Sequence, residues 1–119
     1  MKNGRYITIN GKSKYAKYIT IDGKEKLMIK LTWDEFQDWQ RWDEYPERSD
    51  DPPMTVDFMI FYEGNEYYVT EAYGQYHIYT RDWKSVYAHE NFLKLLTTPI
   101  DFFHGHSFKT IIGKLYFDC

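Results

Sequence analysis

A nine-residue pattern occurs twice near the start of the chain and constrains the fold more than any other feature. Residues 6–14 read YITINGKSK and residues 18–26 read YITIDGKEK, an offset of twelve. Each copy alternates apolar and polar residues up to Asn-Gly or Asp-Gly, which are strong signals for a tight hairpin turn. The repeat therefore predicts a three-stranded antiparallel meander over about residues 5–31.

The length of the two turns decides which residues of this meander share a face. With two-residue turns Ile7 would lie opposite Lys14, and the isoleucines of the first two strands would point to opposite faces. Three-residue loops with a glycine bulge remove this conflict, and we expect them here. The predicted core face then carries Ile7, Ile9, Tyr15, Ile19, Ile21, Leu27, Ile29 and Leu31. The opposite face carries Tyr6, Thr8, Lys14, Tyr18, Thr20, Lys26, Met28 and Lys30.

A helix is predicted directly after the meander. Thr32 and Glu35 match a capping box, which starts a helix that we expect to run to about Tyr45. Aromatic residues recur every third position in it, at Trp33, Phe36, Trp39 and Trp42. At about 100° per residue this spacing sweeps half of the helix circumference, so we expect at least one ring to face solvent.

The second half of the chain repeats the order of strands and then helices. Strands are predicted near residues 55–62, 66–72 and 75–80, and a helix from Asp82 or Ser85 to about Leu96. Ser107 caps a short helix, and residues 114–118 form a closing strand. The expected fold is one α+β domain, residues 1–119, with antiparallel β-meanders, two main helices, and a short C-terminal helix plus strand.

The charge is unevenly distributed along the chain. Residues 1–30 hold eight basic and two acidic side chains (+6), residues 34–51 hold two basic and eight acidic ones (−6), and the net charge is −3. The longest apolar run, residues 58–62, is far shorter than the roughly 20 residues of a membrane-spanning helix. The first 22 residues contain no signal-peptide segment, and the single Cys119 allows no internal disulfide. We expect a cytoplasmic protein without membrane association.

Two histidines are the best metal-ligating candidates. His104 and His106 lie on a short loop where they could bind zinc together with Asp101, Asp118, Cys119, His77 or His89. The alternative is two polar loop histidines beside a glycine turn. The glycines match no phosphate-binding pattern, and no nucleophile elbow surrounds Ser107.

The basic N-terminal meander allows a second interpretation. Lys14, Lys26 and Lys30, with Tyr6 and Tyr18, could bind nucleic acid through phosphate contacts and stacking. Lysines on an exposed sheet face also deter aggregation.

Two stretches resemble a known group of proteins. These are residues 62–69 (YEGNEYYV) and residues 95–100 (LLTTPI) with 105–112 (GHSFKTII). They are similar to the C-terminal half of small accessory proteins of Gram-positive phages and mobile elements, and the similarity covers about half of the chain. Those proteins more often carry Asp-Gly-Lys-Ser where this chain has residues 104–107. Some proteins of this genomic kind inhibit host defence systems, including Cas9-type nucleases, so the resemblance implies an anti-CRISPR-type inhibitor.

The acidic, aromatic-rich segment after Thr32 is the main candidate for partner binding. Carboxylates compete with phosphates for Lys and Arg, and Trp supplies contact area at low entropic cost. We therefore expect a non-enzymatic inhibitor that blocks the basic nucleic-acid-binding surface of a host nuclease. Its predicted contact residues are Asp38, Trp39, Trp42, Asp43, Glu44, Glu47, Asp50 and Asp51. A cofactor is not expected, apart from zinc in the histidine alternative.

Overall fold

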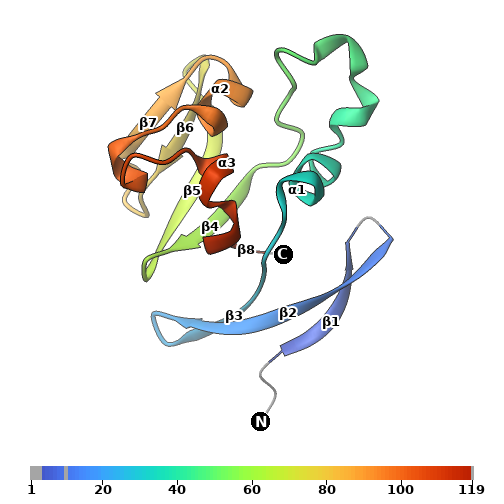
Figure 1. Cartoon of the computed structure of the whole chain (residues 1–119). Helices are drawn as coiled ribbons and strands as arrows, with labels where there is room; N and C mark the ends of the chain where they lie inside the picture. Colours follow the sequence, from blue (N-terminus) through green and yellow to red (C-terminus); the bar gives the residue numbers. More distant parts are fainter. Residues whose placement is uncertain (1–3, 10, 119) are drawn as a thin grey trace.

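The structure, a computed structural model, describes residues 4–9 and 11–118. Among these residues the strands form one eight-stranded antiparallel sheet in the order β1-β2-β3-β8-β4-β5-β6-β7 (Figure 1). The strands are β1 (Gly4–Ile9), β2 (Lys12–Ile21), β3 (Lys24–Ile29), β4 (Phe58–Tyr62), β5 (Asn65–Ala72), β6 (Gln75–Tyr79), β7 (Ser85–His89) and β8 (Tyr116–Asp118). The helices are α1 (Trp33–Trp39), α2 (Phe92–Thr97) and α3 (Phe108–Ile111). The predicted α+β class, with antiparallel meanders and a short C-terminal helix and strand, is confirmed.

The last strand joins two separate meanders. β1, β2 and β3 follow one another in the sheet, and so do β4 to β7, while β8 pairs with β3 on one side and β4 on the other. Phe117 is the central residue of this junction, opposite both Ile29 and Ile60, and its side chain is fully buried. The blue and the green-to-orange parts of Figure 1 are the two meanders.

The turns of the first meander differ from the prediction. Ile9 lies opposite Lys12 and Ile21 lies opposite Lys24, so both connections have two residues and the predicted three-residue loops are wrong. Asp22 and Gly23 both have positive φ, 52° and 76°. This type I′ geometry matches the twist of the strands.

Two-residue turns also change the faces of the meander. Ile7, Ile9, Leu27, Ile29 and Leu31 contribute to the main core as predicted. Tyr15, Ile19 and Ile21 lie on the opposite face, because their pairing puts them out of phase with Ile7. Tyr15 is exposed there, whereas Ile21 is buried.

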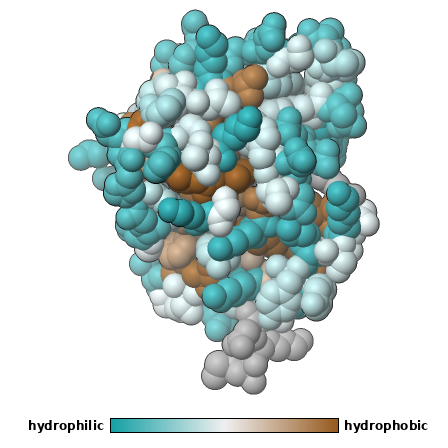
Figure 2. Space-filling model, viewed as in Figure 1, coloured by the Kyte–Doolittle hydropathy of each residue, from teal (hydrophilic) through white to brown (hydrophobic). Residues whose placement is uncertain are grey.

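The main core lies between one face of the sheet and the helices. Sheet residues such as Phe58, Val69 and Ile78 pack in one cluster with helix residues such as Phe36 and Leu95. Hydrophilic residues cover most of the side shown in Figure 2, with hydrophobic patches between them. Within the described part of the chain, none of the helices is long and apolar enough to cross a membrane.

The second predicted helix is shorter than expected. Residues 85–89 are not helical but form β7, which pairs with β6. Val86 and Tyr87 favour a strand, and the edge of β6 supplies hydrogen-bonding partners. Asn91 caps α2, with its side chain accepting a hydrogen bond from the Lys94 amide at 3.0 Å. The predicted start of this helix at Asp82 or Ser85 is therefore wrong, and the helix begins only after Asn91.

The opposite face of the sheet carries a charge cluster that links the two meanders. Glu66 of β5 has only 3% of its side chain exposed, and its carboxylate lies 2.7 Å from Lys26 Nζ and 3.9 Å from Arg81 Nε. Arg81 also pairs with Asp22 in the β2–β3 turn. The hydrogen bond to Glu66 raises the pKa of Lys26, against the opposing effect of burial. These ion pairs connect the meanders independently of β8.

Candidate functional site

α1 begins as the sequence predicts and ends earlier. Thr32 and Glu35 form the complete capping box, and Glu35 Oε1 also accepts a hydrogen bond from Lys14 Nζ at 2.8 Å. Burial alone would raise the pKa of Glu35, but the hydrogen bonds from Lys14 and the Thr32 backbone outweigh it, so the pKa lies below its usual value of 4.5. The predicted continuation to Tyr45 is wrong, because the helix stops at Trp39 and Arg41 adopts a left-handed conformation with φ of 57°. Two 3₁₀ turns, Trp42–Glu44 and Pro46–Arg48, follow.

Gln40, at the end of α1, fixes the segment that returns to β4. Its fully buried side-chain amide accepts from the Thr55 amide at 2.8 Å and the Val56 amide at 3.2 Å, and donates to the Val56 carbonyl at 2.9 Å. The Gln40 side chain thus forms hydrogen bonds with the backbone of Thr55 and Val56 of the kind that a neighbouring strand would form. Residues 41–54 are thereby held as a loop over the end of α1.

The aromatic residues of α1 and of the first 3₁₀ turn pack inward more than we expected. Phe36 is fully buried, and Trp33, Trp39 and Trp42 are half-buried against the core. Trp39 contacts Phe58 and Phe117, with ring centroids 5.7 and 6.0 Å apart. The expectation that one of these rings faces solvent is thus met only in part.

The indole of Trp42 also has a polar partner within the chain. Its Nε1 donates a hydrogen bond to the Pro53 carbonyl at 2.8 Å, and its ring meets the Trp33 ring edge-on with centroids 5.7 Å apart. Trp42 is therefore held in place by contacts within the chain.

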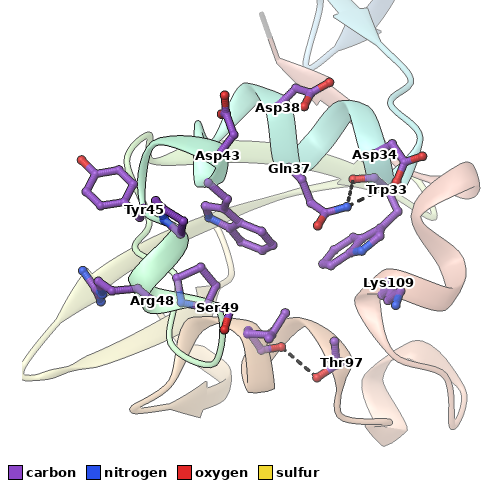
Figure 3. Close-up of a pocket in the computed structure, with 14 residues that line it drawn as sticks. Trp33, Asp34, Gln37, Asp38, Asp43, Tyr45, Arg48, Ser49, Thr97 and Lys109 are labelled. Carbon is purple, nitrogen blue, oxygen red and sulfur yellow. Dashed lines mark hydrogen bonds between the residues drawn. The ribbon is translucent and has the colours of Figure 1, made fainter.

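A cleft of about 640 Å³ lies between α1 with its following turns on one side and α2 with α3 on the other. Trp33, Trp42 and Tyr45 give it an aromatic lining, and Leu93 and Thr97 of α2 face them. Figure 3 shows Trp33 and Gln37 pointing from α1 into this cleft. We call it the α1 cleft.

Charged side chains surround the α1 cleft. Asp34, Asp38 and Asp43 lie along α1 and the turn that follows it, and Lys109 of α3 lies across from them (Figure 3). Arg48 also lines the cleft, and it pairs with Asp51 at 3.5 Å. Lys109 Nζ is 5.2 Å from the centroid of the Trp33 ring, a cation–π contact. Among the described residues no ion pair neutralises any of these three carboxylates.

The predicted contact residues divide into two groups. Asp38, Trp42 and Asp43 line the α1 cleft. The others lie outside its lining: the half-buried Trp39, and the exposed Glu44, Glu47, Asp50 and Asp51. Among the carboxylates of this second group, the structure shows an ion pair within the described part of the chain only for Asp51, which lies 3.5 Å from Arg48.

Only three of the predicted contact residues, Asp38, Trp42 and Asp43, are among those that line the α1 cleft. Of the lining residues that sequence reasoning missed, Trp33 and Gln37 project from the same helix as Asp38, and Tyr45 follows that helix closely in the sequence. Leu93, Thr97 and Lys109 come from helices that only the tertiary structure brings beside α1. The three-residue spacing of the aromatic residues was a signal for Trp33. Nothing in the sequence places Lys109 beside α1.

The residues predicted to form one basic face on the N-terminal meander lie on both faces of the sheet, because the strands pair in a different register from the predicted one. Lys14 and Tyr18 lie on the core-facing side of the sheet, while Lys26 and Tyr6 lie on the other side. Each lysine also has a partner: Lys14 pairs with Glu35, Lys26 with Glu66, and Lys30 lies 5.0 Å from the Tyr116 ring centroid. The predicted nucleic-acid surface therefore does not exist as one face.

The candidate metal-ligating histidines are both exposed, and the imidazole of His104 pairs with a carboxylate, whereas His106 takes part in a hydrogen bond through its backbone. His104 Nε2 lies 2.6 Å from Glu63 Oε1, and the Ile100 amide donates to the His106 carbonyl. The hydrogen bonds that Glu63 accepts from Tyr62 and His104 lower its pKa. Within residues 4–9 and 11–118 no group of three or more His, Cys, Asp or Glu could hold a metal ion. Cys119 lies outside the described residues.

Comparisons with protein-family models, with curated proteins and with solved structures find no match to this chain.

Proposed function

We propose that this chain is a non-enzymatic binding protein whose α1 cleft receives a basic segment of a protein partner. One observation carries the proposal: Trp33 and Trp42 line the same cleft as Asp38 and Asp43, whose carboxylates lie at its outer rim (Figure 3) and form no ion pair among the described residues. Trp faces attract Lys and Arg side chains, and carboxylates pair with them through strong charge-assisted hydrogen bonds. The side chains of Trp33, Trp42, Asp38 and Asp43 together suit a basic side chain better than an acidic or purely apolar one.

The chain's own Lys109 supports this choice of occupant. Its ammonium group already lies over the Trp33 ring, 5.2 Å from the centroid. In this proposal an arginine from a partner displaces Lys109 from the Trp33 ring, which also stacks on Phe36. Because its planar guanidinium stacks on aromatic rings and binds carboxylates in pairs, arginine is better suited than lysine.

The charge of the surrounding segment favours a strongly basic partner. Residues 34–51 carry a local charge of −6, and the exposed Glu44, Glu47, Asp50 and Asp51 extend the negative surface beyond the α1 cleft. Like charges at this density repel one another, and a basic partner relieves that repulsion. Proteins that handle nucleic acids present basic grooves for phosphates.

We therefore propose an anti-CRISPR-type inhibitor from a phage or mobile element, in line with the resemblance noted in the sequence. The proposed partner is a Cas9-type nuclease in the cytoplasm of the host bacterium. The acidic segment would occupy its nucleic-acid groove and exclude DNA. Trp39 packs against Phe58 and Phe117, so in this proposal it supports the segment from inside.

The test reverses two charges at the edge of the α1 cleft. Asp38→Lys with Asp43→Lys should weaken binding to a guide-loaded Cas9-type nuclease at least about tenfold, because rim charges set association rate and partner choice. The matched control is Glu25→Lys with Glu71→Lys, which changes the net charge equally at exposed sites outside the cleft. Binding is measured by surface-immobilised kinetics, and inhibition by displacement of labelled target DNA. Equal losses in the two double variants would show that net charge alone, and not the cleft, decides binding.

A further inference from the structure

Among the described residues, Tyr73 and Trp83 each combine an exposed large ring with a left-handed backbone conformation, and of the two only Trp83 is in contact with other aromatic rings. It lies in the loop between β6 and β7, with φ of 64° and 61% of its surface exposed. The loop is closed by hydrogen bonds from the Thr80 amide to the Lys84 carbonyl (2.8 Å) and from the Trp83 amide to the Thr80 carbonyl (3.0 Å). Glycine adopts this left-handed conformation readily, whereas a bulky residue does not. The turn itself therefore gives no reason for a tryptophan.

The Trp83 ring is fixed over the sheet by two other aromatic residues. It stacks on Tyr68 of β5, with centroids 4.8 Å apart and an interplanar angle of 14°. It meets Tyr79 of β6 edge-on at 5.5 Å. These contacts orient the indole while leaving most of it accessible, which is the arrangement of a preformed stacking surface.

A hollow of about 480 Å³ lies beside this ring. Met59, Tyr68 and Thr70 line it from β4 and β5, on the sheet face opposite the main core, since their neighbours Phe58 and Val69 point into that core. We call it the Trp83 hollow. No residue lines both this hollow and the α1 cleft, so its occupant would be bound independently.

Two carboxylates complete the Trp83 hollow. Thr70 Oγ1 donates to Asp57 Oδ2 at 2.7 Å, which orients that carboxylate, and no described Lys or Arg forms an ion pair with it. Asp118 has Lys26 Nζ at 3.9 Å, but that ammonium group is closer to Glu66, at 2.7 Å. The hollow thus holds negative charge beside an aromatic face and lacks a strong cation of its own.

We propose that the Trp83 hollow binds an arginine side chain of a basic polypeptide. The guanidinium would stack on the indole of Trp83 while its N–H groups donate to Asp57 and Asp118. A planar cation satisfies both features at once, whereas lysine offers no flat surface for the ring. Charge complementarity identifies the occupant, because an anionic or neutral group would leave the carboxylates unmatched.

The experiment uses the full chain and three acetylated peptides that are identical except for one residue, which is arginine, lysine or citrulline. Citrulline keeps the shape of arginine and removes its charge. Binding is followed by NMR through the indole Nε1–H signal of Trp83, identified from its loss in Trp83→Gly. The arginine peptide should shift this signal saturably, the lysine peptide should bind more weakly, and the citrulline peptide should not bind. Equal binding of the citrulline peptide would overturn the proposal.

Two variants separate binding from folding. Trp83→Gly relieves the left-handed strain at this position, so the fold should persist by circular dichroism while peptide affinity, measured by calorimetry, falls at least about fivefold. Asp57→Asn removes the charge but keeps an oxygen that accepts the hydrogen bond from Thr70, and it should lower the peptide affinity by about the same factor. The control Glu71→Gln should retain wild-type affinity for the peptide. In the double variant Asp38→Lys with Asp43→Lys, which alters the α1 cleft, the Trp83 indole signal should titrate as in the wild type. Full peptide affinity in Trp83→Gly, or loss of the Trp83 signal shift in the cleft double variant, would refute a separate site.

Discussion

Replacing Gln40 by leucine tests how the loop over α1 is held in place. Leucine fills a similar volume but removes three side-chain hydrogen bonds, of 2.8, 2.9 and 3.2 Å, to the backbone of Thr55 and Val56. At about 1 kcal/mol net for each bond, the expected loss of unfolding free energy is about 3 kcal/mol. Thr55 is exposed and Val56 half-buried, so water can solvate the freed groups and the cost should not greatly exceed that value.

Gln37→Leu is the matched control, on the same helix and with the same change of side chain. The bonds from Gln37 Nε2 to the Trp33 carbonyl and to Asp34 are both 3.4 Å long, and this geometry is weak. We expect a change within about 0.5 kcal/mol.

Urea unfolding gives both free energies, and amide hydrogen exchange locates the effect. In Gln40→Leu the amides of Thr55 and Val56 should exchange much faster than in the wild type, while amides of β5 and β6 change only with global stability. If Gln40→Leu costs no more than Gln37→Leu, the buried amide does not hold the loop and the reasoning fails.

Two further predictions concern the junction of the meanders and the start of α1. Phe117→Ala should lower the unfolding free energy by about 3–5 kcal/mol, because the fully buried ring lies between β3 and β4. In urea unfolding the half-buried Phe102→Ala should cost clearly less, and a similar cost would contradict the junction role. The lowered pKa of Glu35 stabilises the fold above about pH 4.5, and this contribution is lost as the pH falls through the folded-state pKa. The stability difference between wild type and Glu35→Gln should therefore shrink in acid, and a constant difference would argue against the ion pair with Lys14.

Local signals were sufficient for much of the fold. Asp22-Gly23, Glu63-Gly64 and Tyr73-Gly74 each form a two-residue connection with both residues at positive φ. The capping box at Thr32 was also predicted, because it depends on residues only three positions apart. Local chemistry determines where these turns and this cap lie, so the sequence alone indicates their positions. The two-residue length of the Asp22-Gly23 turn was not predicted.

Features that depend on distant residues were harder to predict. The place of β8 between β3 and β4 is not visible in the order of elements along the chain. Residues 85–89 have an ambiguous pattern, and pairing with β6 selects the strand. The two-residue turns put Ile19 and Ile21 on the sheet face opposite the main core. The charge cluster around Glu66 forms on the same face, and the alternation of apolar and polar residues in the first strands did not indicate it.

The sequence predicted some of the residue types of the candidate site, but it did not predict the cleft that they line. The acidic residues of the segment 34–51 are exposed as expected, apart from Glu35, which is half-buried and pairs with Lys14. The indoles of Trp39 and Trp42 pack inward, since a domain of this size needs their apolar area for its core. The α1 cleft requires Leu93, Thr97 and Lys109 from a separate part of the chain, and no local pattern indicates that contact.

The central claim is that a basic partner docks at the α1 cleft. Hydrogen exchange of the chain, measured with and without a guide-loaded Cas9-type nuclease, tests it most directly. We predict slower exchange in α1, in the following turns through residue 48, and in α2, with little change in β1 and β2. A complex that leaves the cleft amides exchanging at their free rates, or the absence of any complex, would contradict the account.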